Sequence, residues 1–486
     1  MDRKIAKQVE RRKLILSGNL WKTIMIICFP IALYQFINSL STVIDQIITA
    51  NISPDASNAV GSIAQLKNML SAFGGGLASG GAVLVARYYG AGNLKEARHA
   101  SGNLLLISLI LSAVIILVFL PLAVPLMRLC QISETAISIG SNYFRLQLFE
   151  LVFVSINSIF IGLEKAKGNS KLILILNLSI LIVKIGLTAL FVYVFNVEDI
   201  TYIEVATIIS QVILSVIGLV LIFKKSNILK VSVKDLRPKK GYIVDIFKLS
   251  IPIFFGKFVM NLGKVSVNAL CGLYYNATTD ALIVGALGIS NNISGLVTGM
   301  TSTFEESESS IVSQNLGNNN LRRPLKVFAR LLIVALIISA LGYILTRFVL
   351  LDFLVSLFNS NGDNKGAYYS QMIKQVYEFD SLSIPALGIC SAVLGLLYGF
   401  GKTFLASILN FSRIIIRILS IIIFHYAMPN LAGPRVAGIA MGISNGTIFL
   451  LSVIFFIIFF VGLKKHGYRG MHLADPEPDV SALKFD

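Results

Sequence analysis

Twelve long apolar segments constrain the fold of this chain more than any other feature. A helix that crosses about 30 Å of hydrocarbon needs about 20 mostly apolar residues. Segments of this kind lie at residues 21–48, 59–85, 97–120, 142–163, 172–195, 204–223, 243–274, 282–315, 327–358, 375–398, 405–426 and 437–463. Because the backbone polar groups of a lipid-exposed segment must be satisfied internally, this pattern predicts an all-α membrane protein with twelve transmembrane helices.

The composition agrees with a membrane protein. Apolar residues make up 55% of the 486-residue chain, and only 14% of the residues are charged. A soluble protein usually carries about 25% charged residues. There is too little polar side chain here to coat a soluble surface of this size.

The positive charge is concentrated in the loops. Of the 42 Lys and Arg residues, 27 lie at the N-terminus, in alternate loops and in the C-terminal tail, whereas the opposite loops hold 4. Cytoplasmic loops of membrane proteins carry such an excess. We therefore expect a multi-pass protein of the cell (plasma) membrane with both termini in the cytoplasm. The net charge of +17 then reflects the orientation of the chain in the membrane rather than nucleic-acid binding, and we expect no nucleic-acid partner.

The sequence offers little for catalysis or for a bound metal. The four cysteines are far apart, the four histidines are scattered, and no catalytic triad is apparent. The run Gly74–Gly76 and Gly80–Gly81 lacks the Gly-Lys-Ser/Thr ending of a phosphate loop. It is typical instead of close helix packing. We expect a protein that is not an enzyme, with no metal and no cofactor.

The two halves of the chain repeat each other. AVG at 59–61 and ALG at 286–288 each precede a long helix, and the loops after these helices also match. The aligned pairs are Gly90 with Gly317, Gly162 with Gly395, Gly168 with Gly401, Asn177 with Asn410 and Pro30 with Pro252. Because six helices separate the repeats, both halves should run in the same direction, related by an axis along the membrane normal.

The repeat predicts two parallel, pseudo-symmetric lobes of six helices. The N-lobe is expected at 1–223 and the C-lobe at 243–463. A basic linker at 224–242 joins them, and a cytoplasmic tail is expected at 464–486. Two like lobes leave a cleft between them, which suits alternating access.

These features together resemble the multidrug and toxic compound extrusion (MATE) transporters, in the superfamily that also contains lipid-linked oligosaccharide flippases. The resemblance covers roughly residues 15–465. It rests on Pro30 followed by Asp45, the AVG segment, and the loop YYGAGNLKEA with its counterpart QNLGNNNLRR. The Gly-x5-Gly loops before helices five and eleven complete the set.

Asp45 is the strongest candidate for cation coupling. An ionisable group in the membrane is costly unless it faces a cavity or a partner, so each is a functional candidate. Asp45 lies fifteen residues after Pro30, a residue that removes a helix hydrogen bond and allows a hinge. In the family resembled, the acidic residue at this place carries cation coupling. A structural ion pair is the alternative.

The fifth segment departs from the family pattern. Many relatives carry Asn and Asp where this chain has Lys184 and Thr188, and the matching residue of the second half is Arg417. If the lobe packs as in the family, Lys184 reaches Asp45. The lysine would then replace a bound cation, or the pair would open and close as Asp45 takes up a proton.

The second half carries an unusual number of ionisable residues within its predicted helices. They are Lys257, Lys264, Glu305, Glu306, Glu378, Asp380, Arg413 and Arg417. One interpretation is a set of paired charges that holds the lobe together. The other is a polar substrate cleft, whose mixed signs leave zwitterionic and anionic substrates open. Lys67 and Glu150 belong to a group of weaker candidates. Several members of this group lie near segment ends, where long side chains can reach the headgroups.

The sequence thus predicts a secondary active transporter that exports small organic molecules in exchange for protons or sodium ions. We expect a monomer in the lipid bilayer with a small-molecule substrate. A flippase that moves a lipid-linked or anionic head group is the alternative, favoured if Lys257, Lys264, Arg413 and Arg417 line the cleft. A third hypothesis is a sensor or assembly partner that transports nothing.

Overall fold

The computed structural model is a bundle of long helices. It describes residues 3–52, 54–130, 132–195, 199–275, 282–356 and 364–466, and no residue in these ranges belongs to a β-strand. The helices are, in chain order, α1 (Arg3–Ser17), α2 (Leu20–Ile52), α3 (Pro54–Ala91), α4 (Leu94–Phe119), α5 (Ala123–Leu129), α6 (Glu134–Ala166), α7 (Ser170–Ala189), α8 (Thr201–Phe223), α9 (Lys240–Tyr275), α10 (Leu282–Gly317), α11 (Arg322–Ile344), α12 (Leu351–Ser356), α13 (Asn364–Asp380), α14 (Ile384–Gly399), α15 (Thr403–Ala427) and α16 (Gly433–His466). The all-α prediction is confirmed.

Eleven stretches of helix within the described residues are long and apolar enough to cross a membrane. The seventh predicted segment, 243–274, is not among them. It lies within α9, a helix of 36 residues that is as long as its neighbours but contains Lys257, Asn261 and Lys264. The polar side chains lower the hydropathy of α9 without shortening it, so α9 is the candidate for the twelfth span.

Three predicted boundaries need correction. The loop expected at 121–141 contains the short helix α5. The ninth segment ends in a wider π-helical turn, Leu345–Val349, followed by α12. The tenth consists of α13 and α14, joined by a single turn at Ser381–Ser383. Pro385, in the first turn of α14, lacks the N–H that a continuous helix would need there.

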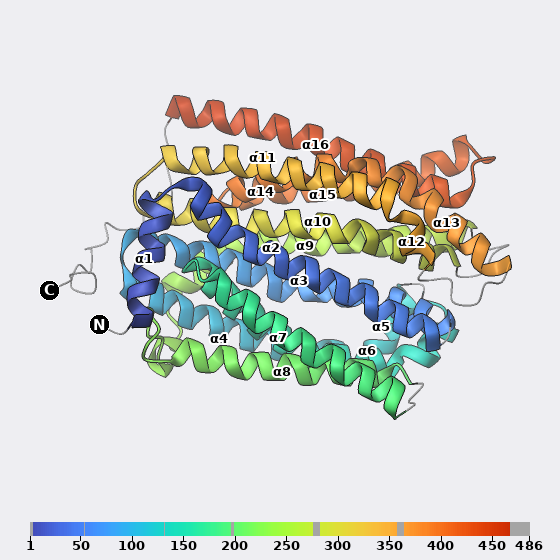
Figure 1. Cartoon of the computed structure of the whole chain (residues 1–486), viewed down its shortest axis with the longest axis horizontal. Helices are drawn as coiled ribbons and strands as arrows, with labels where there is room; N and C mark the ends of the chain where they lie inside the picture. Colours follow the sequence, from blue (N-terminus) through green and yellow to red (C-terminus); the bar gives the residue numbers. More distant parts are fainter. Residues whose placement is uncertain are drawn as a thin grey trace.

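The helices run roughly along one axis and fall into two groups (Figure 1). We call α1–α8 the first half and α9–α16 the second half. The two meet in the middle of the bundle, where α3 packs against α9 and α10 while α2 packs along α10. A methyl group at Gly90 would overlap the backbone of Gln314. The C-terminal ends of α3 and α10 therefore lie against each other at one end of the molecule. The two helices therefore run in the same direction, as the repeat predicts.

Matched residues of the repeat have matched structural roles. A methyl group at Gly317 would overlap the backbone of Arg87, the reciprocal of the Gly90 contact. Gly168 and Gly401, which lie just after α6 and α14, have φ values of +71° and +76°. L side chains rarely adopt this conformation, which explains glycine at both places.

The glycine-rich stretch of α3 brings the two halves into close contact. A Cβ at Gly76 would lie 2.6 Å from Cα of Phe254, and one at Gly80 would lie 2.6 Å from Cα of Ser250. Both neighbours belong to α9. The prediction that these small residues allow close helix packing is confirmed.

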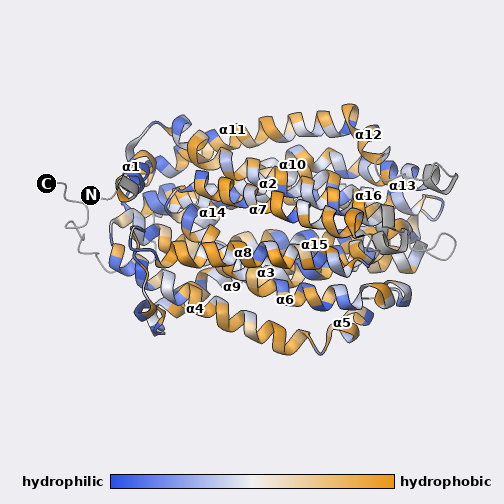
Figure 2. Cartoon of the chain, turned by 60° about the horizontal axis from the view of Figure 1, so that its bottom comes forward, coloured by the Kyte–Doolittle hydropathy of each residue, from blue (hydrophilic) through white to orange (hydrophobic). Residues whose placement is uncertain are grey.

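Apolar residues cover the flanks of the bundle, whereas polar residues gather toward its two ends (Figure 2). Large apolar side chains such as Leu117, Val220 and Leu450 are exposed on helix surfaces. A soluble protein rarely shows so much contiguous apolar surface. The chain is a multi-pass membrane protein.

The predicted linker is packed rather than free. The Arg98 side chain donates to the Leu229 carbonyl over 2.6 Å, and the backbone N–H of Lys239 donates to Asn103 Oδ1 over 2.9 Å. Residues 224–242 are thus held against α4, at the end of the bundle where α3 and α10 meet. We call this the basic end, after the Lys and Arg residues of its loops. Most of the predicted tail, 467–486, lies outside the described residues.

Candidate functional site

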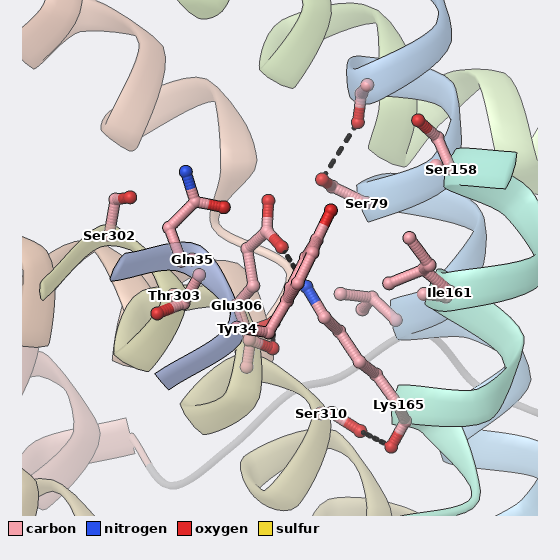
Figure 3. A pocket seen from close by; sticks show the side chains of 16 residues that line it. Tyr34, Gln35, Ser79, Ser158, Ile161, Lys165, Ser302, Thr303, Glu306 and Ser310 are labelled. Carbon is pink, nitrogen blue, oxygen red and sulfur yellow. Dashed lines mark hydrogen bonds and ion pairs between the residues drawn. The ribbon is translucent and has the colours of Figure 1, made fainter. Parts of the chain in front are cut away.

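A cavity of about 310 Å³ lies between the two halves. Its walls come from α2, α3 and α6 of the first half and from α10 of the second (Figure 3). Its charged wall residues are Lys165, in the last turn of α6, and Glu306, on α10. Tyr34 lies beside them. The volume falls at the lower end of the range for small-molecule sites.

An ion pair and a hydrogen bond connect the halves at this cavity. The Lys165 ammonium contacts Glu306 Oε2, and Lys257 Nζ lies 3.3 Å from Glu306 Oε1. Lys257 also donates to Ser79 Oγ on α3 over 3.2 Å. Glu306 thus lies between a cation of each half. Its side chain is 34% exposed and that of Lys165 is 10% exposed, so the cavity reaches both groups.

The rest of the polar wall consists largely of hydroxyl groups that already donate to helix carbonyls. Ser79 donates to Gly75 O over 2.8 Å, and Thr303 donates to Met300 O over 2.7 Å. Ser302, Ser309 and Ser310 also donate to backbone carbonyls. Because their protons are engaged, these hydroxyl groups offer acceptor lone pairs to the cavity.

The bundle is tightly packed beyond the cavity, at the basic end. Gln314 Nε2 donates to Ala166 O over 2.7 Å, and Arg87 donates to Gly399 O over 3.1 Å. Both bonds join the first half to the second. Together with the reciprocal contacts of Gly90 and Gly317, they hold α3, α6, α10 and α14 together.

The N-terminal helix α1 crosses this closed end. Arg12 on α1 donates to the carbonyl oxygens of Tyr89 and Gly90 in the first half. From the second half, Arg323 donates to the carbonyl oxygens of Leu14, Ile15 and Gly18. Burial lowers the pKa of the Arg12 guanidinium, which reflects how closely α1 is packed. Helix α1 therefore bridges both halves.

Asp45 and Lys184 form an ion pair within the first half. Lys184 Nζ on α7 lies 2.5 Å from Asp45 Oδ2 on α2. Thr188, one turn after Lys184, is 1% exposed, and its hydroxyl has no hydrogen-bond partner among the described residues. Pro30 lies inside α2, four turns before Asp45. The structure thus brings Asp45 and Lys184 together, as expected if the lobe packs as in the family resembled.

A second charged cluster in the first half involves residues that the sequence did not favour. Lys67 on α3 forms an ion pair with Glu150 on α6, and its ammonium lies 3.8 Å from Glu204 Oε1 on α8. Both carboxyl groups are 2% exposed. Lys67 and Glu150 were ranked as weaker candidates, and the structure packs both among α3, α6 and α8. Glu204 was missed altogether.

In the second half, the predicted charges are mostly bound within the lobe. Arg417 donates to Ser444 Oγ and to Asn445 Oδ1, both over 2.9 Å. Asn445 also contacts Asp380, so Arg417 reaches this carboxylate through an amide. The Asp380 carboxylate accepts from Ser294 Oγ over 2.6 Å.

The remaining predicted residues are dispersed. Arg413 donates to Asn445 Oδ1 over 2.7 Å, and Lys264 lies within electrostatic range of Arg413 and Arg417. Glu378 pairs with Arg347 at 3.3 Å and is 44% exposed. Glu305 lies within electrostatic range of Lys257. Of the four cations that would favour a flippase, Lys257 is the one with an ion pair to a residue of the cavity wall in the described part of the chain.

No group of three His, Cys, Asp or Glu side chains within the described part of the chain is arranged to hold a metal ion. The described cysteines are not bonded to one another. The polar chemistry at the cavity is that of ammonium, carboxylate and hydroxyl groups.

Comparison with known proteins decides the family. The MatE family model matches residues 30–190 and 252–423, one block in each half. The chain belongs to the MATE family of multidrug efflux transporters.

Individual relatives are distant. The probable multidrug resistance protein YoeA of Bacillus subtilis (strain 168) is 22% identical over 312 residues, which span 63% of this chain and 66% of YoeA. The multidrug export protein MepA of Staphylococcus haemolyticus (strain JCSC1435) is 24% identical over 208 residues, 43% of this chain and 46% of MepA. The alignments therefore leave a third or more of each relative uncovered.

The fold agrees with solved MATE structures. A multidrug resistance MATE family transporter of the MOP superfamily, solved in an outward-facing conformation, superposes with a TM-score of 0.83. The match covers 93% of this chain and 98% of that one at 18% identity. The parallel two-lobe fold predicted from the repeat is confirmed.

Lys165 is the residue of this MATE transporter that sequence reasoning missed at the cavity. It was assigned to a basic loop at 164–171, but α6 continues to Ala166. Its ammonium therefore points into the cavity, toward Glu306 (Figure 3). The hydrophobic pattern gives no signal for this, because the direction of a last-turn side chain depends on how the helix packs.

Proposed function

We propose that this MATE protein is a secondary active transporter that exports small organic molecules by alternating access of the cavity between its halves. The observation that carries the proposal is the position of this cavity. It lies where the two halves meet, charged groups of both line it, and hydrogen bonds between the halves close the basic end. Parting of these contacts would open the cavity toward that end.

Export would be driven by a proton or sodium gradient, with Asp45 as the coupling carboxylate and Pro30 as the hinge of α2. The contact between Asp45 and Lys184 supports a modulating role for the lysine. Thr188 supplies a neighbouring buried hydroxyl. In one mechanism the ammonium replaces a bound cation. In the other, protonation of Asp45 releases Lys184 and lets α2 and α7 move apart.

The proposal includes the setting of the protein. The exporter acts as a monomer in the plasma membrane with both termini in the cytoplasm, so that the basic end faces inward. The excess of Lys and Arg in the loops of that end supports this orientation. The names of YoeA and MepA support a multidrug substrate range.

Dye efflux from energised cells that lack their own exporters tests the proposal. Wild type is compared with Asp45→Asn, with the proton and sodium gradients collapsed separately. Asp352→Asn is the matched control, because this carboxylate is 86% exposed and pairs with Lys374 at the far end of the bundle. Efflux that stops with one gradient and in Asp45→Asn alone supports the proposal. Undiminished efflux in Asp45→Asn would exclude this residue as the coupling group.

A further inference from the structure

The charges on the cavity wall balance. Lys165 supplies one ammonium group and Glu306 one carboxylate, and the two contact each other. Lys257, which is not on the wall, lies 3.3 Å from the same carboxylate. Because the two signs lie side by side, a solute there meets an attractive and a repulsive group whichever single charge it carries.

The uncharged polar groups add to the asymmetry of the site. The hydroxyl groups of Ser79, Ser302 and Thr303 donate to backbone carbonyls, so toward the cavity they act as acceptors. Acceptors suit an ammonium or another hydrogen-bond donor. The two lysines, in contrast, supply only donors, and these suit a carboxylate.

We propose that the cavity selects a zwitterionic solute, one that carries a carboxylate and an ammonium group a few bonds apart. This inference rests on the proposed transport function and names the substrate class of the same site. The solute's carboxylate takes Lys165, and its ammonium takes Glu306 and the neighbouring hydroxyl acceptors. Lys257 remains with Glu306.

Binding is then an exchange of ion pairs without a change of net charge. The pair between Lys165 and Glu306, which joins α6 of the first half to α10 of the second, opens. Two pairs with the solute replace it. A cation that takes Glu306 leaves Lys165 without a partner, and an anion that takes Lys165 leaves Glu306 with Lys257 as its one cation. Either loss is costly in a site of low exposure.

Three fluorescent probes that differ only in charge test this substrate class. They are ε-dansyl-lysine, which is zwitterionic, dansyl-cadaverine, which lacks the carboxylate, and dansyl-aminohexanoate, which lacks the ammonium. Each is titrated into the purified full chain in lipid nanodiscs, and binding is followed by dansyl fluorescence. We expect the zwitterion to bind roughly tenfold more tightly than either singly charged probe, as for one hydrogen bond to a charged group.

Two variants test which residue binds which charged group of the probe. Lys165→Gln should abolish the preference for the zwitterion over dansyl-cadaverine, because the Lys165 ammonium that binds the probe's carboxylate is gone. Glu306→Gln should abolish its preference over dansyl-aminohexanoate. The double variant, which removes both members of the pair between Lys165 and Glu306, should bind all three probes alike and guards against misfolding of the single variants. Lys248→Gln, an exposed site on α9, is the control and should behave as wild type.

Two patterns overturn the substrate class. Tightest binding of dansyl-cadaverine, weakened by Glu306→Gln and strengthened by Lys165→Gln, would make the site cation-selective, and the converse would make it anion-selective. Equal binding that ignores both variants would also refute it. If the site proves cation-selective and the cells export lipophilic cations, the zwitterionic substrate class is refuted but the proposed transport function stands. Zwitterion binding without efflux of any probe from energised cells instead refutes transport.

Discussion

Lys184 Nζ lies 2.5 Å from Asp45 Oδ2, and this contact joins α7 to α2 in the middle of the first half. The two side chains are 17% and 20% exposed, so water only partly screens them. Neutralising either partner leaves the other charge poorly compensated. We expect Asp45→Asn and Lys184→Gln each to lower the free energy of unfolding by about 1–3 kcal/mol. The double variant should lose about 1–2 kcal/mol less than the sum, as interacting neighbours do. Thermal unfolding of the four proteins in detergent gives this cycle, and strict additivity would show that the contact contributes nothing.

The proposed role of the same pair is testable through the pH dependence of efflux. If the pair opens as Asp45 takes up a proton, Lys184→Gln should change the pH profile of efflux, because the charge that faces Asp45 is gone. Initial efflux rates of wild type and Lys184→Gln between mildly acidic and alkaline pH provide the comparison. An unchanged profile together with a new dependence on a cation gradient would favour the lysine as a replacement for the bound cation.

Closure of the basic end depends on glycine at matched positions. A methyl group at Gly317 would overlap the backbone of Arg87, and backbone cannot move aside as a flexible side chain can. Gly317→Ala should destabilise the closed arrangement by about 1–3 kcal/mol, the usual cost of overpacking. Gly446→Ala on α16 is the control, because nothing lies within 4 Å of its Cβ position. The checking measurement is the reactivity of a cysteine placed at Ser309, on the cavity wall. Reagent added from the basic end should reach it faster in Gly317→Ala, and an unchanged rate would count against the seal.

Internal repetition and helix periodicity account for the features that the sequence predicted. The matched glycines indicated the direction of the two halves, and the resemblance to the family implied that Lys184 could reach Asp45. Repetition and periodicity did not predict the positions of Lys165 and Glu204. Lys165 lies in the last turn of α6, and Glu204 lies in the first turn of α8. Near a helix end, the same residue type reaches the headgroups or the interior according to how neighbouring helices pack, and hydropathy does not encode that choice.

The cluster of Lys67, Glu150 and Glu204 predicts an asymmetry between its members. The Lys67 ammonium is the cation near both Glu150 and Glu204, whose side chains are each 2% exposed. Lys67→Met removes the cation from both and should cost about 3–5 kcal/mol, as breaking a buried pair does. Glu204→Gln leaves one lysine with one glutamate and should change stability by less than about 1 kcal/mol. Thermal unfolding of both variants provides the comparison, and equal losses would mean that Lys67 does not hold the cluster together.

Helix α1 should loosen when its bonds to Arg323 of the second half are removed. Arg323 donates to three carbonyl groups near the end of α1, at Leu14, Ile15 and Gly18. Arg323→Ala removes all three bonds, whereas Arg12 still anchors α1 to the first half. We expect amide hydrogen exchange in residues 3–17 to quicken by about tenfold or more, since each bond contributes about 0.5–1.5 kcal/mol. Arg322→Ala is the matched control, because this neighbouring side chain is exposed. If exchange in α1 is equally slow in both variants, Arg323 does not hold the helix, and its remaining contacts, such as the bond from Asn315 to the Ile15 carbonyl, are sufficient.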